Sequence, residues 1–187
     1  MKGARDKTHA PEAHDAYFTI DGRVIPALLR HMTLRGNVWE PAGGKGHMVR
    51  ALEAAGYRVY SSDLVDHGVG IASGIDFLKE TKDHGVGIES IVTNPPNNLN
   101  LAFALHGLKM IEKAHGIVAL YQRHEWDTTQ KTAPIFDHPA FAMKIVCRFR
   151  PRWFEPRAGE EAASPFHKFS WYVWDWRHSG RPVMVFS

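Results

Sequence analysis

The alternation of apolar and polar positions predicts short strands that alternate with helices along most of the chain. Four apolar runs have the length of buried strands: 37–40, 57–63, 90–94 and 116–121. Apolar residues at helical spacing fill 47–55 and about 99–114, and a short helix is predicted over 24–32. Strand–helix alternation is typical of parallel strands joined by crossover helices. The pattern therefore predicts an α/β fold with a doubly wound, mostly parallel sheet.

The pattern changes toward the C-terminus. The segments 141–149 and 169–176 have strand-like apolar content, and no helix of comparable quality separates them. We therefore expect an antiparallel pair of strands at one edge of the sheet. The residues between them are rich in proline, arginine and glycine, which indicates a loop. On the predicted helix 99–114, Leu101, Leu105, Leu108 and Ile111 are expected to form the buried face.

Length and composition indicate one globular unit. The 187 residues suffice for one sizeable domain, and 44% hydrophobic with 23% charged residues is ordinary for this class. Residues 1–14 are polar and aperiodic, so we expect a flexible tail followed by a single domain over 15–187. No apolar run approaches membrane-spanning length and the N-terminus has no signal-peptide core, so a cytoplasmic location is expected.

Charge leaves the class of partner open. The net charge of +3 and a pI near 9.0 permit an acidic partner such as nucleic acid without demonstrating one. Basic residues gather around the predicted C-terminal loop, which indicates either a solvated loop or a phosphate-contacting surface. They are Arg148, Arg150, Arg152, Arg157 and Lys168. The twelve histidines are scattered without the spacing of metal ligands, so no metal site is expected.

Candidate chemistry begins at a glycine-rich turn between the strand 37–40 and the helix that follows it, with the sequence EPAGGKG over 40–46. Glycines allow close approach of a ligand, and the start of a helix offers N–H groups to a polar one. Asp63 ends the next strand, where an acid can accept hydrogen bonds from a ribose diol. Asp76 and Phe77 offer a carboxylate and a ring to an adenine. Together these elements indicate a cofactor that contains a nucleoside.

A second motif interrupts the apolar run near residue 92 with the sequence TNPPN over 93–97. Two adjacent prolines exclude both a strand ladder and a helix interior, so they fix a rigid turn. The side-chain oxygen of Asn94 and the backbone carbonyl of Pro95 can each accept one proton of an amine. Such a pair would aim the nitrogen lone pair at an electrophile, and Pro96 would hold the turn rigid.

These motifs, in this order, resemble those of class I S-adenosylmethionine-dependent methyltransferases, in particular the phage and bacterial N6-adenine methyltransferases of DNA. The resemblance covers roughly residues 15–176 and implies a Rossmann-like fold with a seven-stranded sheet and an antiparallel C-terminal edge hairpin. It implies S-adenosylmethionine as cofactor, with EPAGGKG at its methionine end, Asp63 at its ribose, and the pair Asp76 and Phe77 at its adenine. The cofactor-binding residues implied are Tyr17, Thr19, Glu40, Pro41, Ala42, Gly43, Gly44, Gly46, Asp63, Asp76, Phe77 and Asn94.

The catalytic residues that the resemblance implies are Asn94, Pro95, Pro96 and Asn97, and the last departs from the family. An aromatic residue normally follows Asn-Pro-Pro and stacks on the flipped base, whereas this chain has Asn97. Phe166 or Phe169 could supply a substitute ring, and Trp126 is a weaker candidate. Arg152 and Lys168 are expected to contact the substrate.

The function implied is methylation of the N6 amino group of adenine in DNA. The chain offers no room for a separate target-recognition domain, so loops or a partner subunit would read the sequence. Three alternatives remain open at this point. They are an RNA acceptor, a glutamine amide of a protein, and a degenerate methyltransferase fold that binds nucleic acid or protein without catalysis.

Overall fold

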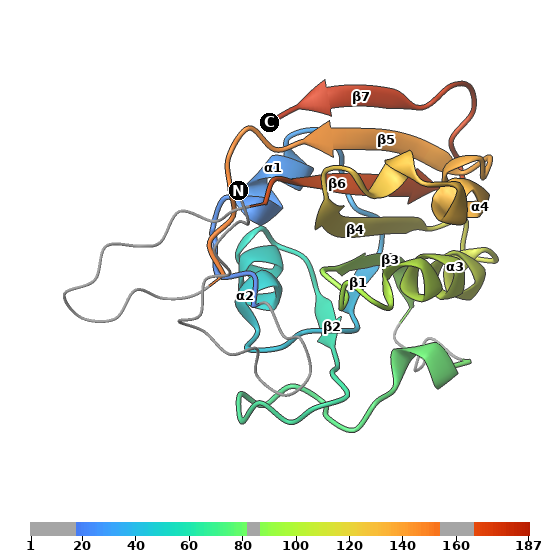
Figure 1. Ribbon diagram of the computed structural model, residues 1–187. Coiled ribbons are helices and arrows are strands. Elements are labelled where there is room, and N and C mark those ends of the chain that lie inside the picture. Colours follow the sequence, from blue (N-terminus) through green and yellow to red (C-terminus); the bar gives the residue numbers. More distant parts are fainter. Residues whose placement is uncertain (1–17, 82–86, 154–166) are drawn as a thin grey trace.

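The computed structural model describes residues 18–81, 87–153 and 167–187, and its strands join in one mixed sheet (Figure 1). The seven strands lie in the order β2-β1-β3-β4-β6-β5-β7. Their bounds are β1 Asn37–Glu40, β2 Val59–Ser61, β3 Ile88–Thr93, β4 Ile117–Arg123, β5 Phe141–Val146, β6 Phe169–Asp175 and β7 Val183–Phe186. The helices are α1 Val24–Leu29, α2 His47–Ala54, α3 Asn100–Ile111 and α4 Ala133–Phe136, with short 3-10 turns at Phe77–Lys79, Trp126–Thr128 and Gln130–Thr132.

Strict alternation along the strands builds two hydrophobic cores, one on each face of the sheet. Val38 faces the side covered by α1 and α2, whereas its neighbour Trp39 faces the side covered by α3 and α4. Tyr172 and Trp174 face the second core, whereas Trp171 and Val173, which alternate with them along β6, face the first. A side-chain period of two therefore lets one sheet bury both of its faces. The predicted doubly wound α/β fold is confirmed.

The C-terminal part of the sheet confirms one prediction and corrects another. Strand β6 is antiparallel to both β4 and β5, as the missing helix between 141–149 and 169–176 predicted. The β5–β6 pair does not form the sheet edge, however. Strand β7 pairs in parallel with β5 and lies outside it, with Met184 paired to Lys144. The pattern gave no sign of this strand, because β7 is short and exposes Val183, Met184 and Phe186.

The buried face of α3 also differs from the predicted one. Leu108 and Ile111 are buried as expected, but Leu105 is 46% exposed. The helix instead buries Phe103, Ala104 and Gly107. Gly107 packs against Val118 of β4, where a Cβ would be at an ordinary contact distance of 3.5 Å. The helix is apolar on more than one face, so periodicity alone could not decide which face meets the sheet.

Strands β1, β2, β3 and β4 are mutually parallel, so their carboxyl ends lie along one edge of the sheet. The chain leaves β1 toward β2 on one side, whereas β3 lies on the other side of β1. This reversal is a topological switch point, the place where open α/β sheets bind their ligands. Among the described residues, no helix is both long enough and apolar enough to span a membrane.

Candidate functional site

The glycine turn leaves β1 at the switch point, and backbone hydrogen bonds determine its shape. The N–H of Gly43 donates to the carbonyl of Ser62 at 3.0 Å, and the N–H of Gly46 donates to the carbonyl of Gly43 at 2.8 Å. Gly44 and Gly46 have φ values of +51° and +74°, in the left-handed region that favours glycine. The turn thus delivers the chain directly into α2, which begins at His47.

At Gly43 and Gly44, neighbouring protein atoms already occupy the space that a side chain would need. A Cβ at Gly43 would lie 2.4 Å from the Ser61 Oγ, and one at Gly44 would lie 2.8 Å from the Phe18 ring. The Lys45 ammonium in turn lies 4.6 Å from the centre of that ring. The glycines are therefore required by the packing of the chain itself. A contact between this turn and a cofactor stays a prediction.

Glu40 is the buried acid of the site, with 1% of its surface exposed. Its Oε1 accepts a hydrogen bond from the N–H of Ala42 at 3.1 Å, whereas its Oε2 is buried and makes no hydrogen bond of normal geometry among the described residues. Burial raises the pKa of this carboxyl to about 8. The nearby Thr93 hydroxyl partly offsets the effect of burial on the pKa of this carboxyl. An unsatisfied buried carboxylate oxygen is costly, so this atom calls for a cationic or hydrogen-bonding ligand.

Asp63 follows β2 and ties the glycine turn to the next loop. Its Oδ2 accepts the N–H of Gly44 at 2.8 Å and its Oδ1 accepts the N–H of Val65 at 2.9 Å. Each carboxylate oxygen can accept a further hydrogen bond, so capacity for a ribose diol remains.

In the described part of the chain, no group of three potential metal ligands of the His, Cys, Asp or Glu type occurs.

Asp76 and Phe77 have local roles in the structure. The Asp76 carboxylate accepts the N–H of Leu78 at 3.1 Å and pairs with Lys79, and the bond from Lys79 lowers its pKa. Phe77 is only 2% exposed, and its ring lies 5.1 Å from that of Trp39 and 4.9 Å from that of Phe103. The ring thus belongs to the core between the sheet and α3. Its predicted contact with adenine would require the ring to be uncovered.

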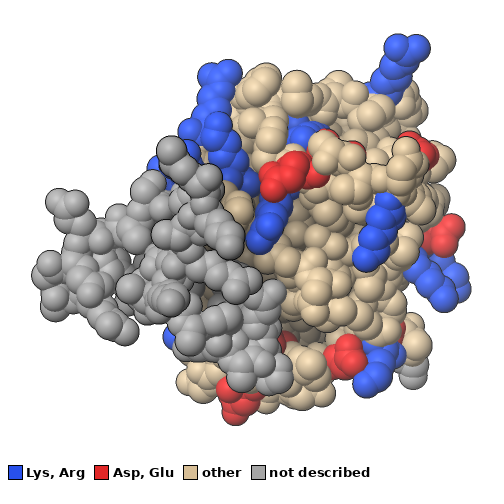
Figure 2. Space-filling model, viewed as in Figure 1, with Lys and Arg blue, Asp and Glu red and all other residues tan. Residues whose placement is uncertain are grey.

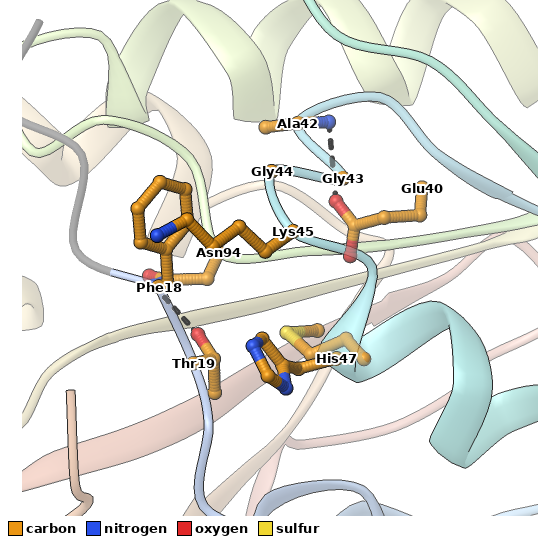
Figure 3. A pocket seen from close by; sticks show the side chains of 10 residues that line it. Phe18, Thr19, Glu40, Ala42, Gly43, Gly44, Lys45, His47 and Asn94 are labelled. Carbon is orange, nitrogen blue, oxygen red and sulfur yellow. Dashed lines mark hydrogen bonds between the residues drawn. The ribbon is translucent and has the colours of Figure 1, made fainter. Parts of the chain in front are cut away.

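Asn94 follows β3 and lies beside the glycine turn in one pocket (Figure 3). Its Nδ2 donates to the Thr19 Oγ1 at 2.9 Å, and Thr19 is buried. In this orientation of the amide, the Asn94 Oδ1 faces away from Thr19. The structure therefore brings together predicted residues from three distant segments. The residues that line the pocket are Phe18, Thr19, Glu40, Ala42, Gly43, Gly44, Lys45, His47, Met48 and Asn94.

The carbonyl of Pro95 is held by a residue that the sequence did not suggest. The buried Gln122 at the end of β4 donates from Nε2 to this carbonyl at 3.2 Å. Asn100, the first residue of α3, donates to the Gln122 Oε1 at 3.1 Å. A carbonyl oxygen has two lone pairs, so Pro95 keeps one for an acceptor amine. The available sequence signal for Gln122 was that it interrupts the apolar run 117–121 just before Arg123.

The candidate substitute rings lie in the core where the structure describes them. Phe169 is 5% exposed and packs between Tyr121 and Trp153, and Trp126 is buried against Tyr172. Asn97 itself is partly exposed in the turn before α3.

Two further predicted residues, Tyr17 and Phe166, lie outside the described residues. Arg152 and Lys168 are exposed at the carboxyl edge, as a substrate contact requires.

Residues missed by the sequence analysis complete the pocket. Phe18, Lys45, His47 and Met48 all line it. Lys45 stands inside the glycine motif, between Gly44 and Gly46, and its charge was the available signal. Phe18 stands between the predicted pair Tyr17 and Thr19, and only its contact with Gly44 reveals its position.

Two solved structures are similar to this fold. One is described as a "modification subunit of a putative type I restriction enzyme from Vibrio vulnificus YJ016", with a TM-score of 0.54 and 15% identity over 89% of this chain and 45% of that chain. The other is described as a "putative methyltransferase from Thermoplasma acidophilum", with a TM-score of 0.45 and 14% identity over 81% and 73% of the two chains. No protein-family model matches the sequence, and a search of curated proteins finds no match.

The first of these similarities shows the fold, which is the Rossmann-like α/β fold found in methyltransferases. This chain spans less than half the length of that protein. The sequence prediction of this fold class is confirmed. The activity, the cofactor and the acceptor are a separate question, to be argued from the site.

Proposed function

We propose that this protein is an S-adenosylmethionine-dependent amino-methyltransferase that methylates the N6 amino group of adenine in DNA. One observation carries the proposal. The glycine turn after β1 and the Asn-Pro-Pro turn after β3 share one pocket at the switch point, with Glu40 and Asn94 both in its lining. A donor site and an acceptor site are thus adjacent, as transfer between two bound molecules requires.

The residues of the pocket fit the proposed cofactor. S-adenosylmethionine carries an ammonium group and a sulfonium, and the unpartnered Oε2 of Glu40 offers them a buried anionic oxygen. Lys45, exposed at the same pocket, offers a cation to the carboxylate of the methionine end. Asp63 would hold the ribose, and Asp76 with Phe77 would hold the adenine. When bound, the cofactor supplies an electrophilic methyl group.

The Asn-Pro-Pro turn would position the acceptor amine. The exocyclic nitrogen of adenine is a poor nucleophile because its lone pair is delocalised into the ring. Hydrogen bonds from its two N–H groups to the Asn94 Oδ1 and the Pro95 carbonyl would favour tetrahedral geometry at nitrogen. Thr19 and Gln122 orient these two acceptors by the bonds described above. The amine proton is lost to solvent after transfer, so the site needs no strong base.

A direct test uses S-adenosylmethionine with a labelled methyl group and DNA as acceptor. After incubation the DNA is digested to nucleosides, and N6-methyladenine is the expected labelled product. We expect Asn94→Ala to lower the transfer rate by at least about 100-fold with little change in cofactor affinity. Asn98→Ala, in the exposed part of the same turn, is the matched control and should retain the rate.

The other acceptors are separated in the same assay. RNA and a glutamine-bearing protein are offered in competition with DNA, and label in either one would replace adenine in DNA as the acceptor. Cofactor binding without transfer to any acceptor would indicate a degenerate binding module. Absence of cofactor binding in calorimetry would reject the proposal entirely.

A further inference from the structure

Five exposed arginines form one continuous surface at the carboxyl edge of the sheet, beyond the pocket. This arginine surface consists of Arg23, Arg30, Arg148, Arg150 and Arg152. Strands β5 and β7 end at this edge, and Figure 2 shows Lys and Arg side chains gathered there beside the C-terminus. The whole chain carries a net charge of only +3, so five cations in one place are a strong local concentration.

Contacts between neighbouring segments make this surface continuous. Arg30 donates to the Ser187 Oγ at 3.2 Å, and the N–H of Arg148 donates to the Ser187 carbonyl at 2.8 Å. Arg23 donates from Nη2 to the carbonyl of Arg150 at 3.3 Å. The arginines therefore come from the two ends of α1 and from the segment after β5, and Ser187 lies between the two.

Aromatic rings hold two of the guanidinium groups. The Arg23 guanidinium lies 4.4 Å from the centre of the Phe149 ring, and the Arg148 guanidinium lies 4.7 Å from the centre of the Phe186 ring. A guanidinium stacked on a ring keeps the N–H groups along its edge available to a planar anion. This arrangement suits bidentate contacts to phosphate better than a set of mobile lysines would.

A buried acid anchors the surface without cancelling its charge. The Asp21 side chain is 0% exposed, and its Oδ2 accepts bonds from the Arg23 Nη2 at 2.7 Å and from the N–H of Arg152 at 3.1 Å. Burial opposes its ionisation, but these bonds keep the pKa of Asp21 below its ordinary value. Among the described residues, Asp21 is the one acidic side chain that forms an ion pair with any of the five arginines, and it contacts only Arg23 and Arg152.

A short segment, residues 19–23, joins the arginine surface to the pocket. Thr19 holds Asn94 in the pocket, and Arg23 follows four residues later. That length of chain spans at most about 14 Å, which corresponds to about four nucleotide steps along one DNA strand. A strand whose base entered the pocket would therefore bring phosphates to the surface within a few nucleotides.

We infer that the arginine surface binds the phosphate backbone of nucleic acid and aligns the strand that carries the target base. The position of that strand rests on the proposed function, whereas the binding itself does not require methyl transfer. Contacts of this kind fix orientation and register and carry no sequence information. The surface would therefore supply affinity and alignment, and sequence recognition would have to come from other contacts.

The test measures binding of a fluorescent DNA duplex by anisotropy over a series of salt concentrations, without S-adenosylmethionine. The variant Arg30→Gln/Arg148→Gln/Arg150→Gln leaves Arg23 and Arg152 on Asp21. We expect it to weaken binding and to flatten the plot of log affinity against log salt by up to about 2.7, which is about 0.9 for each lost phosphate contact. The matched control, Arg58→Gln/Lys109→Gln/Lys113→Gln, removes the same charge elsewhere and should keep the slope.

Each outcome decides the inference. Equal flattening in both variants would show a general charge effect, and an unchanged slope in the first would reject the surface. Arg30→Lys/Arg148→Lys/Arg150→Lys should keep the slope, which guards against misfolding as the cause. Competition by polyglutamate as strong as that by DNA would assign the surface to an acidic protein instead. Absence of methyl transfer by the wild type, together with DNA binding whose salt dependence the first variant flattens, would reject the proposed function alone.

Discussion

The two turns that share the pocket are held in place in different ways. The glycine turn is shaped by left-handed glycine conformations and by backbone–backbone bonds, such as those from Gly43 to Ser62 and from Gly46 to Gly43. The Asn-Pro-Pro turn is oriented by side chains from far along the chain. Thr19 bonds to Asn94 across 75 positions, and Gln122 bonds to the Pro95 carbonyl across 27.

This difference distinguishes the backbone shape of a turn from the orientation of the groups that it presents to a substrate. The glycine turn follows from backbone conformations that few residue types can adopt, so a single substitution should destroy it. The prolines make the second turn rigid, but rigidity alone does not aim the Asn94 amide or the Pro95 carbonyl. Substitutions at the distant partners should therefore affect turnover and leave cofactor affinity unchanged. Five experiments test the two turns and the buried Glu40 beside the first of them.

The largest effect is expected from Gly44→Val. A β-branched residue at φ +51° is strained by about 1–3 kcal/mol, and its Cβ would meet the Phe18 ring at 2.8 Å. Distortion of the turn should lower affinity for S-adenosylmethionine by about 100-fold, measured by calorimetry, and should lower the melting temperature. Gly22→Val is the control, since a Cβ at Gly22 meets no atom within 4 Å. Unchanged affinity in Gly44→Val would contradict a cofactor site at this turn.

Next in size is the pH dependence that Glu40 should impose on cofactor binding. The pKa of about 8, raised by burial, keeps this acid protonated at neutral pH until a cationic ligand binds. Affinity should therefore fall by up to about tenfold per pH unit below 8, with release of a proton on binding. Calorimetry in buffers of different ionisation enthalpy measures that proton. The variant Glu40→Gln should lose this release, and retention of it would assign the proton to another group.

The raised pKa of Glu40 should also make the free energy of unfolding depend on pH. The folded protein holds the Glu40 proton more tightly than the unfolded chain, whose glutamates ionise near pH 4.5. The stabilisation is complete below that pH, decreases as the pH rises, and is lost above about pH 8. In denaturant titrations without cofactor, the wild type should therefore lose stability relative to Glu40→Gln across this window. Parallel curves would show that Glu40 is not buried in this way.

A smaller effect is expected from Gln122→Met, which keeps the volume but removes both hydrogen bonds of the amide. The Pro95 carbonyl and Asn100 would lose their partner, at a cost of about 1–1.5 kcal/mol for a bond of this kind. We expect kcat to fall by about tenfold while affinity for S-adenosylmethionine is retained. A fall in cofactor affinity of the same size would place Gln122 in the stability of the whole pocket instead of the alignment of the second turn.

The smallest effect is expected from Asn97→Tyr, which restores the aromatic residue common in the family that the motifs resemble. If an adenine stacks at this position, the ring should lower the KM for DNA by several-fold, because stacking contributes about 1–3 kcal/mol per base. The kcat should change little, since stacking supports the ground and transition states alike. A loss of activity on every acceptor would show that no space for a ring exists beside Asn97.

Much of the fold and the order of the motifs followed from the sequence. The strand 37–40 was predicted with the bounds that the structure has, and the doubly wound sheet followed from alternating periodicities. The glycine turn was recognisable because left-handed φ values select glycine at Gly44 and Gly46. The Asn-Pro-Pro motif was recognisable because prolines exclude regular structure. In each case the physical cause is local along the chain.

Only the tertiary structure decided which residues meet. Leu105 was predicted to be buried and is exposed, because α3 packs on the sheet with the face that carries Phe103, Ala104 and Gly107. Phe77 packs in the core between Trp39 and Phe103, and β7 lies outside the predicted edge. The contacts of Thr19 with Asn94 and of Gln122 with Pro95 join segments that no pattern relates. Local preference determines which turns and strands can form, whereas the partner of a side chain is known only once distant segments have packed together.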